Sequence, residues 1–277
     1  MSVAMLIMPM VDGLAKHLSA HYSPLFIGWA RYAVASFIVL PLAAVLRGFP
    51  LFPGERRASH VWRTAFLVAS MTLYFLSVAR LPLATATSAF LIAPIAGVVL
   101  SILVLRERLT SRKTLALALG AAGSLVILQP GASTDRSVLL ALGSGLVFAM
   151  YIIATRHASQ ASDPIRTLAF QCVIGTVLLT PQALQSWRTP EPSDALAFLA
   201  LGGISALSHM MSVAAFRFAG ASTLSPLIYL ELVGATLIGK VAFGDVPSRS
   251  TVVGAGFIVA AGLVLLRAKE GATPRVK

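Results

Sequence analysis

Long apolar stretches alternate with short polar segments along the whole chain. A helix needs about 20 mainly apolar residues to cross a bilayer, and no polar segment is long enough to form a separate soluble domain. The pattern therefore predicts an all-α integral membrane protein with ten transmembrane helices. These are expected over residues 2–18, 24–46, 61–79, 84–105, 114–129, 137–155, 165–186, 195–216, 222–243 and 250–267.

The second half of the chain repeats polar and helix-breaking positions of the first half at an offset of about 140 residues. Residues 1–131 and residues 132–277 would each hold five of the expected helices. Because five is odd, the second half must enter the membrane in the opposite sense, as in inverted-repeat secondary transporters. The matching pairs include Lys16 and Arg156, Pro24 and Pro164, Pro41 and Pro181, Ser88 and Ser225, and Glu107 and Asp245.

Composition agrees with a polytopic membrane protein. Only 12% of the 277 residues are charged and 57% are hydrophobic, whereas soluble domains carry about 25% charged residues. The net charge of +12 does not predict nucleic-acid binding, because the basic residues lie at the ends of apolar stretches rather than in one patch.

The distribution of basic residues instead predicts the orientation of the chain in the membrane, since cytoplasmic loops are enriched in Lys and Arg. With a cytoplasmic N-terminus, fifteen fall on the inner side and six on the outer side, and Arg31 lies within a span. This bias predicts a cytoplasmic (inner) membrane protein with both termini cytoplasmic. The inner set is Arg47, Arg56, Arg57, Arg63, Arg106, Arg108, Arg112, Lys113, Arg156, Arg166, Arg217, Arg267, Lys269, Arg275 and Lys277, and the outer set is Lys16, Arg80, Arg136, Arg188, Lys240 and Arg249.

The first apolar stretch has no basic segment before it and no cleavage site, so it is not read as a removed signal peptide. It is unusually short and begins at Met1. The absence of a few native N-terminal residues from this sequence, or a misassigned start codon, would produce that pattern.

Several classes of activity lack their sequence motif. The chain has no GxxxxGK[ST] phosphate loop, which predicts that it has no ATPase of its own. It has no HExxH motif for a metalloprotease and no GxSG-type serine-protease motif with a histidine on another span. We therefore predict no enzyme activity, no cofactor and no metal site.

Ionisable residues within a span point to function, because a charge at the centre of a spanning helix costs about 2.5–3.5 kcal/mol on insertion scales. Glu231 lies near the middle of the expected helix 222–243. It could contact substrate or couple transport to protons, or it could form a structural ion pair with Arg31. Arg31 could in turn bind a substrate carboxylate or phosphate.

Asp12 and Lys16 lie one helical turn apart and share a helix face. Either they form an i,i+4 pair that lowers the cost of burying both charges, or they face a cavity and separate when substrate arrives. Weaker site predictions are Tyr74, Tyr151, His209 and Tyr229.

Two stretches resemble the EamA family of the drug/metabolite transporter superfamily. One runs from Arg80 to Pro94 and on into Leu105-Arg106-Glu107-Arg108-Leu109-Thr110. The other runs from Arg217 through Glu231 to Phe243-Gly244-Asp245-Val246-Pro247. The resemblance covers the whole chain. It implies ten helices in two inverted five-helix repeats, with a central cavity lined mainly by helices one, three, four, six, eight and nine.

Residues Val11-Asp12-Gly13-Leu14-Ala15-Lys16 and Trp29-Ala30-Arg31-Tyr32 resemble the branch that includes S-adenosylmethionine and riboflavin importers. The expected function is a secondary transporter that moves a small organic metabolite by alternating access, as a monomer or homodimer in the lipid bilayer. The candidate substrates are S-adenosylmethionine, riboflavin or another vitamin, and amino acids, and the proton is a possible coupling ion. The alternatives are a lipid flippase, a channel or an intramembrane enzyme.

Overall fold

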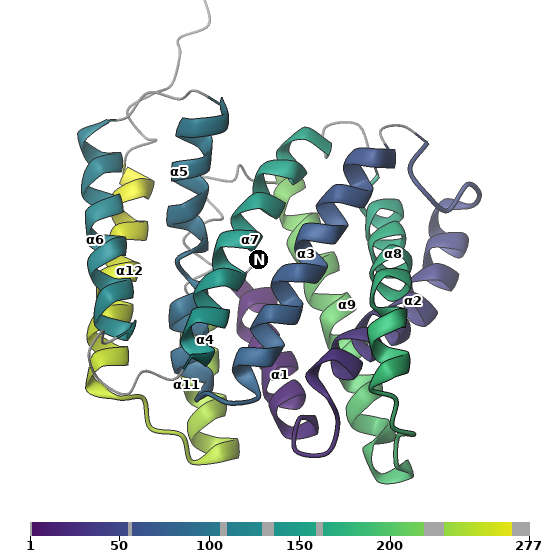
Figure 1. The fold of residues 1–277 in the computed structure, drawn as a ribbon. Coiled ribbons are helices and arrows are strands. Elements are labelled where there is room, and N and C mark those ends of the chain that lie inside the picture. Colours follow the sequence, from purple (N-terminus) through teal and green to yellow (C-terminus); the bar gives the residue numbers. More distant parts are fainter. Residues whose placement is uncertain are drawn as a thin grey trace, which may run out of the picture.

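The computed structural model describes residues 2–54, 57–105, 110–128, 136–158, 163–218 and 230–267, which form a bundle of α-helices (Figure 1). One 3₁₀ helix, η1, precedes α9. The elements are α1 (Ser2–Leu18), α2 (Pro24–Arg47), α3 (Arg57–Val78), α4 (Leu83–Phe90), α5 (Ala93–Leu105), α6 (Ser111–Leu128), α7 (Ser137–Ala158), α8 (Pro164–Gln185), η1 (Pro192–Asp194), α9 (Ala195–Phe218), α11 (Leu230–Phe243) and α12 (Arg249–Arg267).

Several of these helices could cross a membrane. Five segments of the described residues are long and apolar enough to do so, namely 24–47, 57–78, 137–154, 164–185 and 192–212. Shorter apolar helices cover 83–97, 114–127 and 249–264. The protein is therefore a multi-pass membrane protein. The first part of the expected helix 222–243, up to residue 229, lies outside the described residues.

The repeated prolines of the two halves begin helices at equivalent places. Pro24 opens α2 after Ser23, whose hydroxyl oxygen accepts a hydrogen bond from the Leu25 amide at 3.3 Å. Pro164 opens α8 after Asp163, whose Oδ1 accepts from the next two free amides of that helix. Proline suits the first helical turn because its missing N–H would have had no partner there.

Helix packing pairs the two halves of the chain. By the sequence offset, α1, α2, α3, α5 and α6 correspond to α7, α8, α9, α11 and α12. Figure 1 shows α6 beside α12 on one side of the bundle and α2 beside α8 on the other. Likewise, α3 packs on α7 and its counterpart α9 on α1, and α1 packs on α11 as α7 does on α5. When each helix is replaced by its counterpart in the other half, the α6–α12 and α2–α8 contacts are unchanged. The α3–α7 contact becomes α9–α1, and the α1–α11 contact becomes α7–α5.

The single helix expected over residues 84–105 is broken in the structure, which corrects that prediction. The chain turns at Leu91, between α4 and α5. Pro94 is the physical reason, because it has no N–H to donate to the Phe90 carbonyl and its ring would clash with that carbonyl in a continuous helix. Gly145 of α7 packs directly on the break, and a Cβ there would lie only 2.5 Å from the Phe90 oxygen.

Candidate functional site

Asp12 is the centre of a buried hydrogen-bonded group between α1, α3 and α4. Its side chain is 1% exposed. The Tyr74 hydroxyl donates to Asp12 Oδ2 at 3.2 Å and lies 2.8 Å from the Thr87 hydroxyl oxygen. A tyrosine has only one hydroxyl proton, so when Tyr74 donates to Asp12, Thr87 must be the donor to Tyr74. The three side chains therefore form a directed chain that ends on the carboxyl group.

Glu231 lies beside this group, in the first turn of α11. It is buried, and α11 packs on α1, which carries Asp12, and on α4. Two carboxyl groups thus share one buried region, one from each half of the chain. Such proximity disfavours two simultaneous negative charges.

Arg31 of α2 is also 1% exposed, but it does not form the ion pair with Glu231 that the sequence left open. Within the described residues, its guanidinium has no carboxylate partner. Its Nη1 donates to the Ser205 hydroxyl at 3.1 Å, and the group lies 4.5 Å from the Tyr32 ring centroid and 5.6 Å from that of Phe75. Its Nε and Nη2 make no hydrogen bond to the residues that the structure describes.

Arg63 is a second buried guanidinium, which the sequence predicts on the inner side of the membrane but not as a site residue. Helix α3 begins at Arg57, and Arg63 is only 4% exposed. Its Nη2 donates to Gln171 Oε1 at 2.5 Å, and it lies 5.5 Å from the ring centroid of Tyr151. Its Nε has no hydrogen-bond partner in the described part of the chain. An arginine two positions inside an expected span was the signal that could have identified it.

His209 of α9 lies one helical turn after Ser205, the residue that accepts a hydrogen bond from Arg31. Its Nε2 is buried and finds no hydrogen-bond partner among the described residues. Through Ser205, the structure brings the predicted residues Arg31 and His209 to the same part of α9. Of the two remaining predicted tyrosines, Tyr151 packs at 5.2 Å between ring centroids against Phe148, and Tyr229 lies outside the described residues.

Lys16 does not pair with Asp12, which corrects the i,i+4 interpretation. Its ammonium group binds Asp245 Oδ2 at 2.5 Å and donates to the Leu81 carbonyl at 3.1 Å. It also lies 4.9 Å from the ring centroid of Phe243. Lys16 therefore ties the end of α1 to the residues that follow α11, apart from the Asp12 group.

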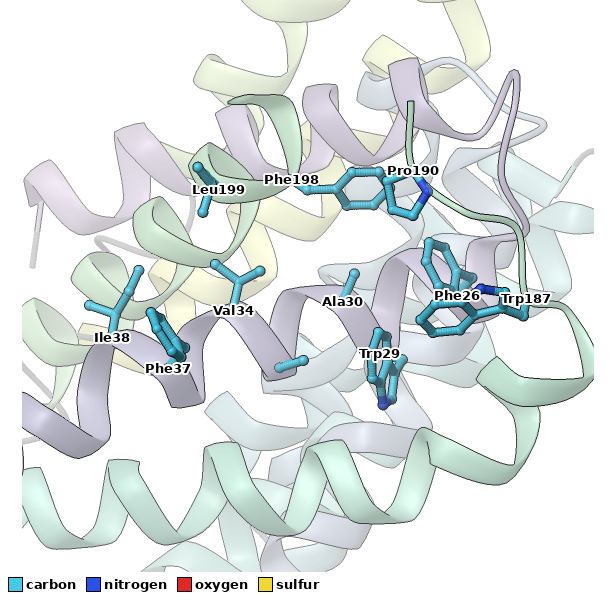
Figure 2. A pocket seen from close by; sticks show the side chains of 11 residues that line it. Phe26, Trp29, Ala30, Val34, Phe37, Ile38, Trp187, Pro190, Phe198 and Leu199 are labelled. Atoms are coloured by element: carbon cyan, nitrogen blue, oxygen red, sulfur yellow. The ribbon is translucent and has the colours of Figure 1, made fainter. Parts of the chain in front are cut away.

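Two hollows of about 270 Å³ each lie elsewhere on the molecule. Figure 2 shows the first, where Phe26, Trp29 and Trp187 gather at one end and Val34, Phe37 and Leu199 line the rest. Its lining is almost wholly apolar, and neither hollow is lined by the polar residues above. The hollow in Figure 2 follows α2 and α9. In the described conformation, the inner polar side chains are closed off by packing.

The described residues hold no group of three His, Cys, Asp or Glu side chains that could bind a metal ion. The buried polar groups include the carboxyl groups of Asp12 and Glu231. They also include guanidinium N–H donors of Arg31 and Arg63 that have no hydrogen-bond partner among the described residues.

Comparison with known proteins supports a transport role. The model of the EamA-like transporter family matches residues 1–129 and 135–267. An S-adenosylmethionine uptake transporter of Rickettsia prowazekii is 24% identical over 260 residues, which cover 94% of this chain and 88% of that protein. A riboflavin transporter of Vibrio cholerae is 24% identical over 264 residues, which cover 94% of this chain and 89% of that protein. A crystal structure with 19% identity superposes with a TM-score of 0.65 over 98% of each chain, which shows the fold.

Proposed function

This chain belongs to the EamA-like transporter family, and we propose that it is a secondary transporter that moves a small organic metabolite across the cytoplasmic membrane by alternating access. Its named relatives are metabolite transporters. Substrate would bind among the buried polar residues, and the two halves would then rock to expose it to one side at a time.

The observation that carries this proposal is that the buried polar residues come from both halves. In a protein that rocks one repeat against the other, the substrate site lies between the repeats. Side chains that only stabilised one half would not need partners in the other. The first half contributes Asp12, Arg31, Arg63 and Tyr74, and the second contributes Gln171, Ser205, His209 and Glu231.

We further propose that the protein has ten membrane spans in two inverted five-helix repeats, residues 1–131 and 132–277, and that both termini are cytoplasmic. The helix contacts that exchange between the halves support it, as do the matched starts of α2 and α8. The break between α4 and α5 is a further support, because transporters of this kind often place substrate beside discontinuous helices.

S-adenosylmethionine and riboflavin are the first substrates to test, because relatives with these named substrates match nearly the whole chain. The shared location of Asp12 and Glu231 supports proton coupling, since a pair of close buried carboxyl groups can hold one proton. A lipid flippase is the second candidate function, and the apolar hollow along α2 and α9 is the feature that favours it (Figure 2).

The test is uptake by purified protein in liposomes. Labelled S-adenosylmethionine, riboflavin and a panel of amino acids are offered at two pH values, with protein-free liposomes as the control. The proposal expects saturable uptake of at least one compound. Movement of a labelled lipid between leaflets without uptake of any metabolite would favour the flippase, and an ion conductance without uptake would favour a channel.

A further inference from the structure

An open apolar groove runs along the surface of the bundle between α2 and α9 (Figure 2). Two small side chains, Ala30 and Ala33, lie in the lining of this α2–α9 groove, and Phe37 and Leu199 beside them are 82% and 56% exposed. Exposed apolar surface of this kind marks contact with a membrane or a partner. Because both helices are long and apolar enough to cross a membrane, the groove is expected to face lipid.

The groove has about the length of a lipid chain in one leaflet. Its lining residues on α2 run from Phe26 to Ile38, which is about 18 Å at a helical rise of about 1.5 Å per residue. The hydrocarbon core of a bilayer is about 30 Å thick, so one leaflet supplies about 15 Å of it. An acyl chain that lies along α2 would therefore reach from one end of the groove to the other.

The end of the groove at Phe26 has the composition of a membrane interface. Two tryptophans gather there, and tryptophan is enriched where the bilayer meets water. The ring centroids of Trp29 and Trp187 are 5.5 Å apart, and that of Phe26 lies 5.7 and 5.2 Å from them. The Trp29 indole N–H donates to the Thr180 hydroxyl at 3.1 Å, so its ring offers the groove apolar surface. Lipid headgroups are therefore expected at this end.

The loop between α8 and α9, which includes one of these tryptophans, brings charged side chains to the same end. Tyr22 holds the loop, since its hydroxyl accepts a hydrogen bond from the Glu191 amide at 2.9 Å and donates one to Asp194 Oδ2 at 2.8 Å. Arg188 Nη1 donates to the His21 carbonyl at 2.8 Å, and the guanidinium lies 5.6 Å from the Tyr22 ring centroid. Arg188 and Glu191 are therefore positioned by the protein itself.

Arg188 and Glu191 offer one positive and one negative group to a lipid headgroup. Arg188 Nη2 and Glu191 Oε1 are 3.7 Å apart, too far for a direct hydrogen bond, and the two side chains are 55% and 61% exposed. A guanidinium suits a phosphate, and a carboxylate accepts from the N–H donors of a primary ammonium. Asp194 adds a second carboxylate, so the loop is net negative and disfavours an anionic headgroup.

We propose that the α2–α9 groove binds phosphatidylethanolamine, with an acyl chain along α2, the phosphate at Arg188 and the ammonium at Glu191. This headgroup uses both side chains. Phosphatidylcholine has a quaternary ammonium without an N–H, and phosphatidylglycerol has a phosphate without a cation. The inference goes beyond the transport function and does not depend on it, because this lipid would occupy its site whichever metabolite is carried.

The first test uses tryptophan fluorescence of the full-length protein in liposomes. Trp62 of α3 is 65% exposed, and Trp62→Phe leaves Trp29 and Trp187 as the only tryptophans. Phosphatidylethanolamine, phosphatidylcholine and phosphatidylglycerol, each brominated on the acyl chains, are offered at equal mole fraction in unbrominated lipid. We expect phosphatidylethanolamine to bind roughly two- to fivefold more strongly than the others, the range that exposed charge pairs give. Equal quenching by all three, or stronger quenching by phosphatidylglycerol, would overturn the proposal.

The second test assigns the two headgroup contacts. Glu191→Gln should bring the binding ratio of phosphatidylethanolamine to phosphatidylcholine close to one, and Glu191→Asp, which keeps the carboxylate, should leave it above one. Arg188→Gln should weaken phosphatidylethanolamine relative to brominated diacylglycerol, which has no phosphate. Arg80→Gln is the matched control at another exposed arginine and should not. Unchanged ratios in Glu191→Gln and Arg188→Gln would overturn the proposal.

The third test fills the groove. Ala33→Phe places a ring among the lining residues and should lower quenching by all three phospholipids. Val45→Phe, at a position of α2 that is 84% exposed, is the control and should not. Size-exclusion profiles identify a variant that has not folded, and the headgroup comparison stands without it. Unchanged quenching in folded Ala33→Phe would overturn the proposal, and so would a Trp62→Phe protein that no lipid quenches because a second copy of the chain covers the groove.

Discussion

Lys16 and Asp245 are 229 positions apart, and their side chains are joined at 2.5 Å. The contact links the last turn of α1 to the residue after the turn that ends α11. Gly244, with a φ of 67°, makes that turn possible, and the Asp245 amide donates to the Gly239 carbonyl at 2.9 Å. Asp245 is thus presented to Lys16 by a fixed backbone.

Reversing either charge of this pair should destabilise the protein, and reversing both should restore much of the loss. Both side chains are about one-fifth exposed, so we expect roughly 1–2 kcal/mol for each of Lys16→Asp and Asp245→Lys, between a surface and a buried pair. Thermal unfolding of the detergent-solubilised protein measures the loss of stability in each variant. A doubly reversed variant no more stable than the single variants would rule out the pairing.

Tyr74→Phe should lower stability by about 1 kcal/mol, because it removes a buried hydrogen bond to Asp12. The energies of Tyr74→Phe and Asp12→Asn should not add in the double variant, since both act on one contact. The melting temperatures of the two single variants and the double variant provide the check. Additive losses would mean that Tyr74 and Asp12 are not coupled.

Glu231→Gln should abolish transport while leaving the amount of folded protein unchanged. The substitution keeps the side-chain shape and removes the carboxylate. Uptake in liposomes and size-exclusion profiles measure the two quantities, with Glu231→Asp as the variant that keeps the charge. Wild-type uptake by Glu231→Gln would remove this residue from the site.

Gly145→Ala should destabilise the bundle by roughly 1–3 kcal/mol, as overpacking of a tight contact does. The new Cβ would lie 2.5 Å from the Phe90 carbonyl oxygen and 2.6 Å from Ile92 Cγ2. Gly143→Ala is the matched control on the same helix, where the nearest atom, Leu73 Cδ1, is 3.8 Å away. It should be neutral or stabilising, because alanine favours helix over glycine. Equal melting temperatures for both variants would contradict the packing at the break.

The apolar pattern was enough to predict most helices. The expected helix 24–46 is α2, and the expected helix 165–186 is α8, each within one residue of its observed ends. A Ser-Pro or Asp-Pro pair marks the start of each of these helices, and the long apolar stretch that follows it favours a spanning helix. The break after α4 was not predicted, because the apolar pattern continues through it and only Pro94 marks it.

The partners of the polar residues were harder to predict. Lys16 has Asp12 one turn away in the sequence, but the closer partner comes from the far end of the other half. Arg63 was placed on the inner side of the membrane, but its interior partner, Gln171 of α8, was not predicted. Such contacts depend on how the helices pack, which a single sequence does not specify.

Counterflow is the most direct test of alternating access. Liposomes that contain the protein are preloaded with unlabelled substrate, taken from the uptake panel, and then diluted into a trace of the same labelled compound. A carrier whose site faces one side at a time should draw label in faster than empty vesicles do and accumulate it transiently above its equilibrium level. Label entry at the same rate with and without preloading, and without that overshoot, would contradict the account.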